Sequence, residues 1–274
     1  MLHRLLPRPL RMVISLTMAL LLPGCGGISI SRFKPATLWI IALDITTSVP
    51  KDHFFVMRND MAPYVILSRL RNREEVHMMP VDSNPENRVR VMQLSKPSGM
   101  ANEIAAMAAH LQTFKRPDES PNESKRKQKS ETPLTTNIAG VLSYTKRNTQ
   151  ELAQERQRVA ASGKPLPPAP LVIGNIFTDG LPEGPQTPLP PGPWPAEVMV
   201  WFWGVEQAHE VSLKLWATTK MGLPEAQVHI VRFTDWQTVA DKIYGPQIGR
   251  PQPNLDILRR LASSKTLAQV AGTK

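Results

Sequence analysis

Short apolar runs alternate with amphipathic stretches along most of the chain. The runs are apolar at consecutive positions, which is typical of strands buried on both faces of a parallel sheet. Between them, apolar residues recur at helical spacing, as Ile104, Met107 and Leu111 do. This alternation predicts an α/β fold with three layers: a doubly wound, mostly parallel sheet with helices on both faces. The expected strands lie at 37–44, 76–81, 88–94, 171–180, 196–205 and 226–233.

Two of the expected helices have features that a tertiary structure can test. The helix that ends at Gly222 is expected to turn Val211, Leu215 and Trp216 inward, because these residues share one helical face. Pro63 is expected to end or kink the helix after the first strand, because proline lacks the N–H group that continues a helix.

Composition separates a main domain from accessory segments. The domain is expected to span residues 37–250. Residues 115–132 contain no large apolar side chain, which predicts a charged flexible insert. Residues 181–195 form a proline-rich loop in which Trp194 is expected to be exposed at a partner surface. Residues 251–274 are expected to form a C-terminal helix or tail.

The N-terminus has the layout of a secretory signal: arginines, an apolar run of about a dozen residues, then small residues. The run is too short to span a bilayer comfortably. The stretch "LPGC" ends at Cys25, the only cysteine among 274 residues. One interpretation is a plain N-terminal helix with a chance cysteine; the other is a lipoprotein signal.

"LPGC" resembles the lipobox of bacterial lipoproteins. The resemblance implies that residues 1–24 are a cleaved signal peptide, that Cys25 is acylated, and that 25–36 form a lipidated tether. Acyl chains would anchor the protein to a membrane, at roughly 0.8 kcal/mol per buried CH₂. Gly26 follows the cysteine in place of aspartate. By resemblance to Gram-negative lipoproteins, this implies the outer membrane, with the protein facing the periplasm of the cell envelope.

The net charge and the sequence motifs argue for some classes of function and against others. The net charge of +10 favours acidic partners or an anionic membrane surface. No basic stretch is interleaved with aromatic residues as a stacking platform needs, so we expect no nucleic-acid partner. The sequence has no glycine-rich phosphate loop, no Gly-x-Ser-x-Gly elbow and no histidine pair at metal-ligand spacing. We therefore expect a protein that is not an enzyme.

Oxygen-bearing side chains lie at the predicted ends of two strands and at one helix start. "DITTS" places Asp44, Thr46 and Ser48 after the first strand, "TTN" places Thr136 before a helix, and "TDG" places Asp179 after another strand. Ligands of parallel sheets bind beyond the carboxyl ends of the strands. Carboxylate and hydroxyl oxygens suit Mg²⁺, Mn²⁺ or Ca²⁺. In the metal-free alternative, Asp44 and Ser48 cap the next helix and Asp179 forms an Asp-Gly turn.

Together, in this order, these motifs resemble the metal-ion-dependent adhesion site (MIDAS) of von Willebrand factor A (vWA) domains. That family carries Asp-x-Ser-x-Ser after its first strand, a threonine in a later loop and Asp-Gly after its fourth strand. The resemblance implies a vWA/Rossmann-like fold and a Mg²⁺ site with hydroxyl ligands and carboxylates that ligate directly or through water. The residues that it implicates are Asp44, Thr46, Ser48, Thr136 and Asp179.

The match departs from the family pattern at three points: the residue at position 46, the spacing before the threonine loop, and the presence of two adjacent threonines in that loop. Thr46 stands where the family usually has serine, but the hydroxyl is retained. The charged insert lengthens the spacing before the threonine loop. Within that loop Thr136 is chosen over Thr135, because Thr136 precedes Asn137. In the family, an acidic residue of a protein partner fills the open coordination position of the metal.

The expected function is a membrane-anchored lipoprotein whose vWA-like domain binds a protein partner through a divalent metal. The alternative is a structural or scaffold component of a cell-envelope or secretion assembly, with a vestigial, metal-free site. A hydrolase that uses the same aspartates with Mg²⁺ is a third possibility, for which no general base is apparent.

Overall fold

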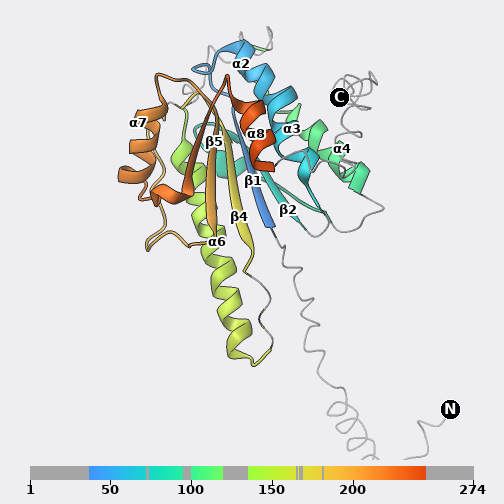
Figure 1. Cartoon of the computed structure of the whole chain (residues 1–274), viewed down its shortest axis with the longest axis vertical. Helices are drawn as coiled ribbons and strands as arrows, with labels where there is room; N and C mark the ends of the chain where they lie inside the picture. The colour runs from blue at the N-terminus through green and yellow to red at the C-terminus, as the bar shows by residue number, and fades with distance from the viewer. Residues whose placement is uncertain are drawn as a thin grey trace, which may run out of the picture. The chain divides into compact units, whose positions relative to one another are not determined.

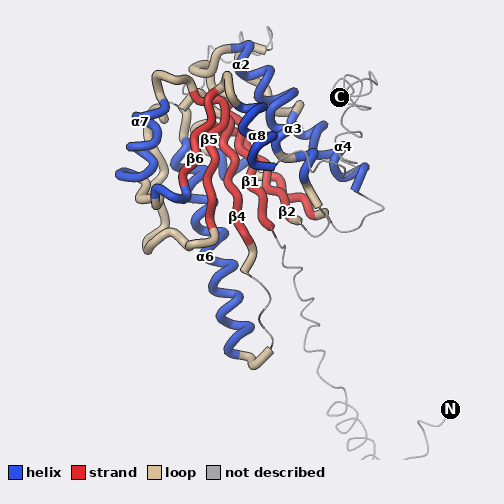
Figure 2. Tube along the Cα trace, viewed as in Figure 1, coloured by secondary structure: helices blue, strands red, loops and turns tan. Residues whose placement is uncertain are grey.

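Six strands form one sheet in the computed structural model (Figure 2). They are β1 (Thr37–Asp44), β2 (Glu75–Val81), β3 (Arg90–Gln93), β4 (Leu171–Phe177), β5 (Val198–Val205) and β6 (Val228–Arg232). Their order across the sheet is β3-β2-β1-β4-β5-β6. All neighbours pair in parallel except β2 and β3, which pair antiparallel. The predicted mostly parallel α/β sheet is therefore confirmed.

The structure describes only part of the chain. None of residues 1–36 is described. The predicted signal peptide, tether and tail, with Cys25, lie outside the described residues. No helix among those that are described is long and apolar enough to cross a membrane. The described residues are 37–71, 74–94, 100–119, 135–164, 166, 169–180 and 182–244.

Helices cover both faces of the sheet, as Figure 1 shows. They are α2 (Lys51–Val56), α3 (Ala62–Val65), α4 (Met100–Leu111), α6 (Ile138–Ala161), α7 (Glu210–Leu215) and α8 (Trp236–Tyr244). Because successive strand residues point to opposite faces, Trp39 and Ile41 enter one apolar cluster while Leu38 and Ile40 enter another. Helices α2, α3, α4 and α8 close the first cluster, and α6 and α7 close the second. The predicted three-layer arrangement is confirmed.

The helical path passes through Pro63 instead of ending there. A π-helical turn, Met57–Met61, precedes α3, and Pro63 lies in the first turn of α3. Proline cannot donate the hydrogen bond of a helix interior and its ring crowds the preceding turn. A π turn is one of the ways in which a helix accommodates such an interruption. The expected break is thus a local change of helical type.

The predicted inward face of α7 is wrong. Val211 and Leu215 are 78% and 59% exposed, whereas Leu213 and Ala217 are buried against the sheet. Trp216 is half-buried at the edge of the same cluster. Two stripes of this segment fit helical spacing, and a π-helical stretch, Trp216–Lys220, shifts the phase after the first turns. As predicted, the segment ends near Gly222, whose φ is +62°.

Trp194 is not exposed, contrary to the sequence expectation. Its side chain is 8% exposed, and its indole Nε1 donates a hydrogen bond to the carbonyl of Met221 at 2.8 Å. The Lys146 ammonium lies 5.4 Å from the centre of the indole ring. The proline-rich loop is therefore packed onto the domain at this point, because the indole covers the apolar cluster under α6 and α7.

Candidate metal centre

The strand order places the predicted site where the connections of the sheet reverse direction. From β1 the chain proceeds to β2 on one side, and it later returns to β4 on the other side. Leu43 of β1 lies opposite Phe177 of β4, so Asp44 and Asp179 occupy adjacent positions at the carboxyl edge. Ligands of open α/β sheets bind in the crevice at such a reversal. The topology thus brings the two carboxylates to the same place.

Asp44 is completely buried and held by hydroxyl groups. The backbone N–H and the hydroxyl of Thr46 donate to its Oδ1 at 3.0 and 2.7 Å. The hydroxyl of Thr178 donates to its Oδ2 at 2.8 Å. Burial raises the pKa of Asp44 to about 7, and the nearby charge of Asp179 adds to the rise, while the hydrogen bonds oppose it. Among the residues described, no cation pairs with this carboxylate.

Three hydroxyl oxygens meet beside Asp44. The Oγ1 atom of Thr46 lies 2.7 Å from Oγ of Ser48 and 2.9 Å from Oγ1 of Thr136. Ser48 and Thr136 are 3.4 Å apart. The cluster therefore joins the loop after β1 to the start of α6. Thr46 and Thr136 are buried, whereas Ser48 is partly exposed and opens the cluster to solvent.

The local structure around α6 explains why Thr136 enters the cluster and Thr135 does not. Asn137 caps the helix, and its Oδ1 accepts from the Gly140 N–H at 2.9 Å. Thr136, directly before the cap, points to the hydroxyl cluster. Thr135 instead contacts the Ser83 side chain, with its N–H and hydroxyl 3.1 and 3.3 Å from the serine Oγ. The structure thus brings Thr136 to the hydroxyl cluster and Thr135 to Ser83.

Thr178 is the residue that sequence reasoning missed. It lies between β4 and Asp179, is fully buried, and its hydroxyl links the two carboxylates, 2.8 Å from Asp44 and 3.5 Å from Asp179. The only sequence signal is its place in "TDG" next to a predicted ligand. Thr47, between Thr46 and Ser48 in sequence, is exposed.

These residues suit a hard divalent cation. The donor set combines the carboxylates of Asp44 and Asp179 with the hydroxyls of Thr46, Ser48 and Thr136, which are the oxygen ligands that Mg²⁺, Mn²⁺ and Ca²⁺ prefer. Within the described residues, no three His, Cys, Asp or Glu side chains gather as a metal-binding group. A site here would therefore depend on hydroxyl ligands. A buried carboxylate without a counter-ion is costly, and a cation would relieve that cost.

Arg116, which lies outside the three site motifs, contacts the loop that follows Ser48. The guanidinium of Arg116, which is 4% exposed, donates to the carbonyl of Val49 and at 2.9 Å to Asp118. Nearby, Arg58 donates to both oxygens of Glu119 at 3.0 Å. These contacts place the described start of the predicted 115–132 insert against the domain and show that it is not a solvated loop there. Residues 120–132 lie outside the described part.

No family model matches the chain, and no curated protein matches it. Solved structures that resemble it include the following two. Proximal thread matrix protein 1 from the mussel byssus is 14% identical, with a TM-score of 0.41 over 77% of this chain, which spans 47% of that protein. The N-terminal domain of TFIIH p34 is 12% identical, with a TM-score of 0.29 over 87% of this chain and 98% of the other. At these sequence identities and TM-scores, the two matches support no conclusion about function.

Proposed function

We propose that this protein is a membrane-anchored binding module in which a divalent metal at the carboxyl edge of the sheet captures an acidic side chain of a protein partner. The observation that carries the proposal is the cluster of three hydroxyls beside the buried Asp44. None of these three hydroxyls caps a helix, because α2 follows Pro50 without a side-chain cap and α6 is capped by Asn137, so the cluster suits a ligand better than a cap.

Each side chain has a distinct task in this proposal. Thr46, Ser48 and Thr136 offer hydroxyl oxygens to the cation, and Asp44 and Asp179 supply the negative charge. Ser48 is the partly exposed member, so the open side of the site faces solvent there. A bound Mg²⁺ would supply an electrophilic centre that accepts a carboxylate oxygen from outside the protein. The resemblance of the three motifs to the MIDAS pattern of vWA domains supports this assignment.

Calorimetric titration of the full chain in detergent with Mg²⁺ and Mn²⁺ tests the metal site. We expect wild type to bind one ion and Asp44→Ala to lose binding, because the substitution removes a charge and the acceptor that orients Thr46. Asp82→Ala is the matched control, since Asp82 is a buried aspartate that pairs with Arg88 after β2. Equal heats from wild type and Asp44→Ala would overturn the proposal.

The lipid anchor is a separate part of the proposal and rests on the sequence around Cys25. Labelling cells with an alkyne fatty acid should tag wild type and leave Cys25→Ala untagged. An untagged wild-type protein would contradict the anchor without affecting the metal site.

One observation favours a second function, a scaffold component of a cell-envelope or secretion assembly. Asp44 already accepts three hydrogen bonds from Thr46 and Thr178, so the cluster is satisfied internally to a large extent. A vestigial site would look the same. Pull-down with and without a chelator separates the two functions, since scaffold binding would persist in EDTA and metal-dependent capture would not.

A further inference from the structure

The proline-rich loop starts at one predicted ligand and returns to another. It follows Asp179 and Gly180 at the end of β4, and residues 183–187 then lie against the segment that carries Thr136. The Glu183 N–H donates to the Thr136 carbonyl at 3.1 Å. Gly184, at a φ of +68°, packs so closely on Thr135 that a Cβ there would lie 2.6 Å from it. The loop therefore connects two ligand segments that are far apart in the sequence.

Gln186 makes the central contacts of this connection. Its amide Nε2 donates to the carbonyls of Thr136 at 3.2 Å and Glu183 at 2.9 Å. Its Oε1 accepts from the Ala139 N–H at 3.2 Å, which satisfies a backbone donor in the first turn of α6. The Gln186 side chain is therefore hydrogen-bonded to the Thr136 carbonyl and to the Ala139 N–H of the same segment.

Thr187, the next residue of the loop, makes two further hydrogen bonds to this segment. The Thr187 N–H donates to Oδ1 of Asn137 at 3.1 Å, and the Asn137 amide donates back to the Thr187 hydroxyl at 2.7 Å. Asn137 also caps α6, so the loop and the helix cap share one acceptor atom. The backbone of residues 136–139 is therefore fixed by the loop as well as by its own helix.

We infer that Gln186 is a positioning residue for the metal site, which it serves by fixing Thr136 relative to Asp179. The inference rests on the proposed metal binding and extends it to a residue outside the motif. Mg²⁺ demands a near-octahedral arrangement at about 2.0–2.1 Å, whereas Ca²⁺ tolerates longer and less regular coordination. A looser Thr136 would therefore penalise Mg²⁺ more than Ca²⁺.

The test compares Gln186→Met with Gln150→Met in the full chain. Methionine keeps the length of the side chain and removes both hydrogen-bonding groups. Gln150 is the matched control, because it donates from α6 to the carbonyl of Pro191 in the same loop, at 2.9 Å, away from Thr136. Mg²⁺ and Ca²⁺ are titrated into each protein by calorimetry, and melting in EDTA is recorded for each.

For Gln186→Met we expect roughly 10–100-fold weaker Mg²⁺ binding, the usual cost of losing an outer partner of a metal ligand. The loss in Ca²⁺ affinity should be smaller, so selectivity moves toward Ca²⁺, a change that a purely structural role would not cause. Gln150→Met should bind both ions as wild type does. Unchanged Mg²⁺ affinity in Gln186→Met, or an equal loss in Gln150→Met, overturns the inference and leaves the proposed function standing. Failure of wild type to bind Mg²⁺ overturns both.

Discussion

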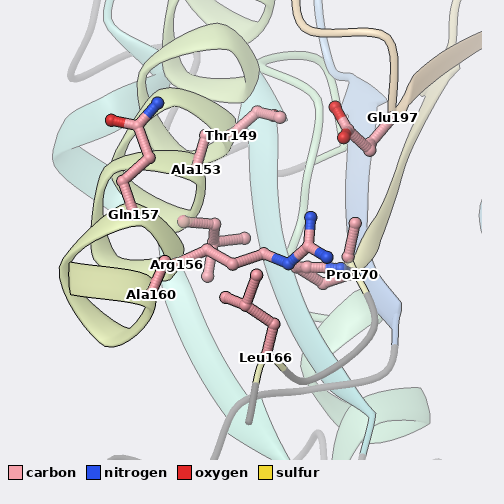
Figure 3. A pocket seen from close by; sticks show the side chains of 10 residues that line it. Thr149, Ala153, Arg156, Gln157, Ala160, Leu166, Pro170 and Glu197 are labelled. Atoms are coloured by element: carbon pink, nitrogen blue, oxygen red, sulfur yellow. The ribbon is translucent and has the colours of Figure 1, made fainter. Parts of the chain in front are cut away.

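Two regions at opposite ends of α6 both gather polar side chains, and they differ in how those side chains are held. At the helix start, oxygens from the β1 loop, the α6 cap and the end of β4 converge in a buried cluster. Toward the other end of α6, a cavity of about 250 Å³ is bounded by exposed or half-buried side chains and by the buried Thr149 (Figure 3). Its walls include Arg156, Leu166, Pro170 and Glu197.

The candidate site is distinguished by the convergence of side chains from distant segments, and not by the presence of a cavity. The cavity lies beside the residues that lead into β4 and β5, at the amino ends of the strands. Parallel sheets bind ligands at the opposite edge, where connections diverge from neighbouring strands. Thr149 in the cavity wall donates its hydroxyl to Thr145 in its own helix, at 2.8 Å. Thr136 instead reaches a residue 90 positions away in sequence.

The largest expected effect on Mg²⁺ affinity among these comparisons is the difference between removing a hydroxyl at the start of α6 and removing one toward its other end. Thr136→Val preserves the shape of the side chain and should weaken Mg²⁺ binding by about 100-fold or more, which corresponds to about 2.7 kcal/mol. Thr149→Val removes a buried hydroxyl from the cavity end and should leave Mg²⁺ affinity unchanged. Calorimetry on both variants measures this. Equal Mg²⁺ affinities of Thr136→Val and Thr149→Val would show that the two regions do not differ in metal binding.

A smaller effect is expected from pH. Burial raises the pKa of Asp44 to about 7, so protons compete with Mg²⁺ below that pH, and affinity at pH 6 should be about tenfold lower than at pH 8. Without metal, the quantity that changes with pH is the stability of the fold, and it falls as the pH rises. A carboxyl whose folded pKa is raised stabilises the fold at low pH, and that contribution is lost as the pH rises to about 7.

Two measurements check the pH dependence. Mg²⁺ titrations at pH 6 and pH 8 give the ratio of affinities, and urea unfolding in EDTA across the same range gives the stability. Asp44→Asn should flatten the stability profile, because asparagine does not titrate. Equal Mg²⁺ affinity at both pH values would show that Asp44 does not lie at the metal.

The smallest effect is expected at the cavity. Leu166 is 50% exposed, so Leu166→Ala should change the free energy of unfolding by less than about 0.5 kcal/mol and leave Mg²⁺ affinity unaltered. Urea unfolding measures the first quantity and calorimetry the second. A loss above about 2 kcal/mol would instead place Leu166 in a packed wall, comparable with core leucines.

Sequence reasoning succeeded where one periodic signal dominated. Residues 38–43 of β1 are all apolar, because both faces of this strand are covered. Few structures other than a buried strand explain such a short continuous apolar run. It failed on α7, where Leu213 and Leu215 lie on different stripes that fit helical spacing equally well. It also failed on Trp194, because proline content says nothing about the distant Met221 carbonyl that the indole reaches.

For the candidate site, the sequence supplied the residue types and their places at element ends, but not the contacts between them. The structure brings Thr46, Ser48 and Thr136 within 3.4 Å of one another, and whether they hold a metal stays a prediction. Thr178 had only its place in "TDG" as a signal, and Gln186 had none, since a threonine or glutamine in a loop is common. Their roles exist only through Asp44 and Thr136.

The sequence was sufficient to predict the class of the fold and the oxygen-bearing side chains at the ends of its strands. Local rules suffice for both, because burial on two faces demands continuous apolar runs and turns follow from nearby residues. Only the tertiary structure decided which stripe of α7 faces the sheet and which side chains meet Asp44. Those outcomes depend on β1 and β4 lying side by side, a pairing between residues more than a hundred positions apart.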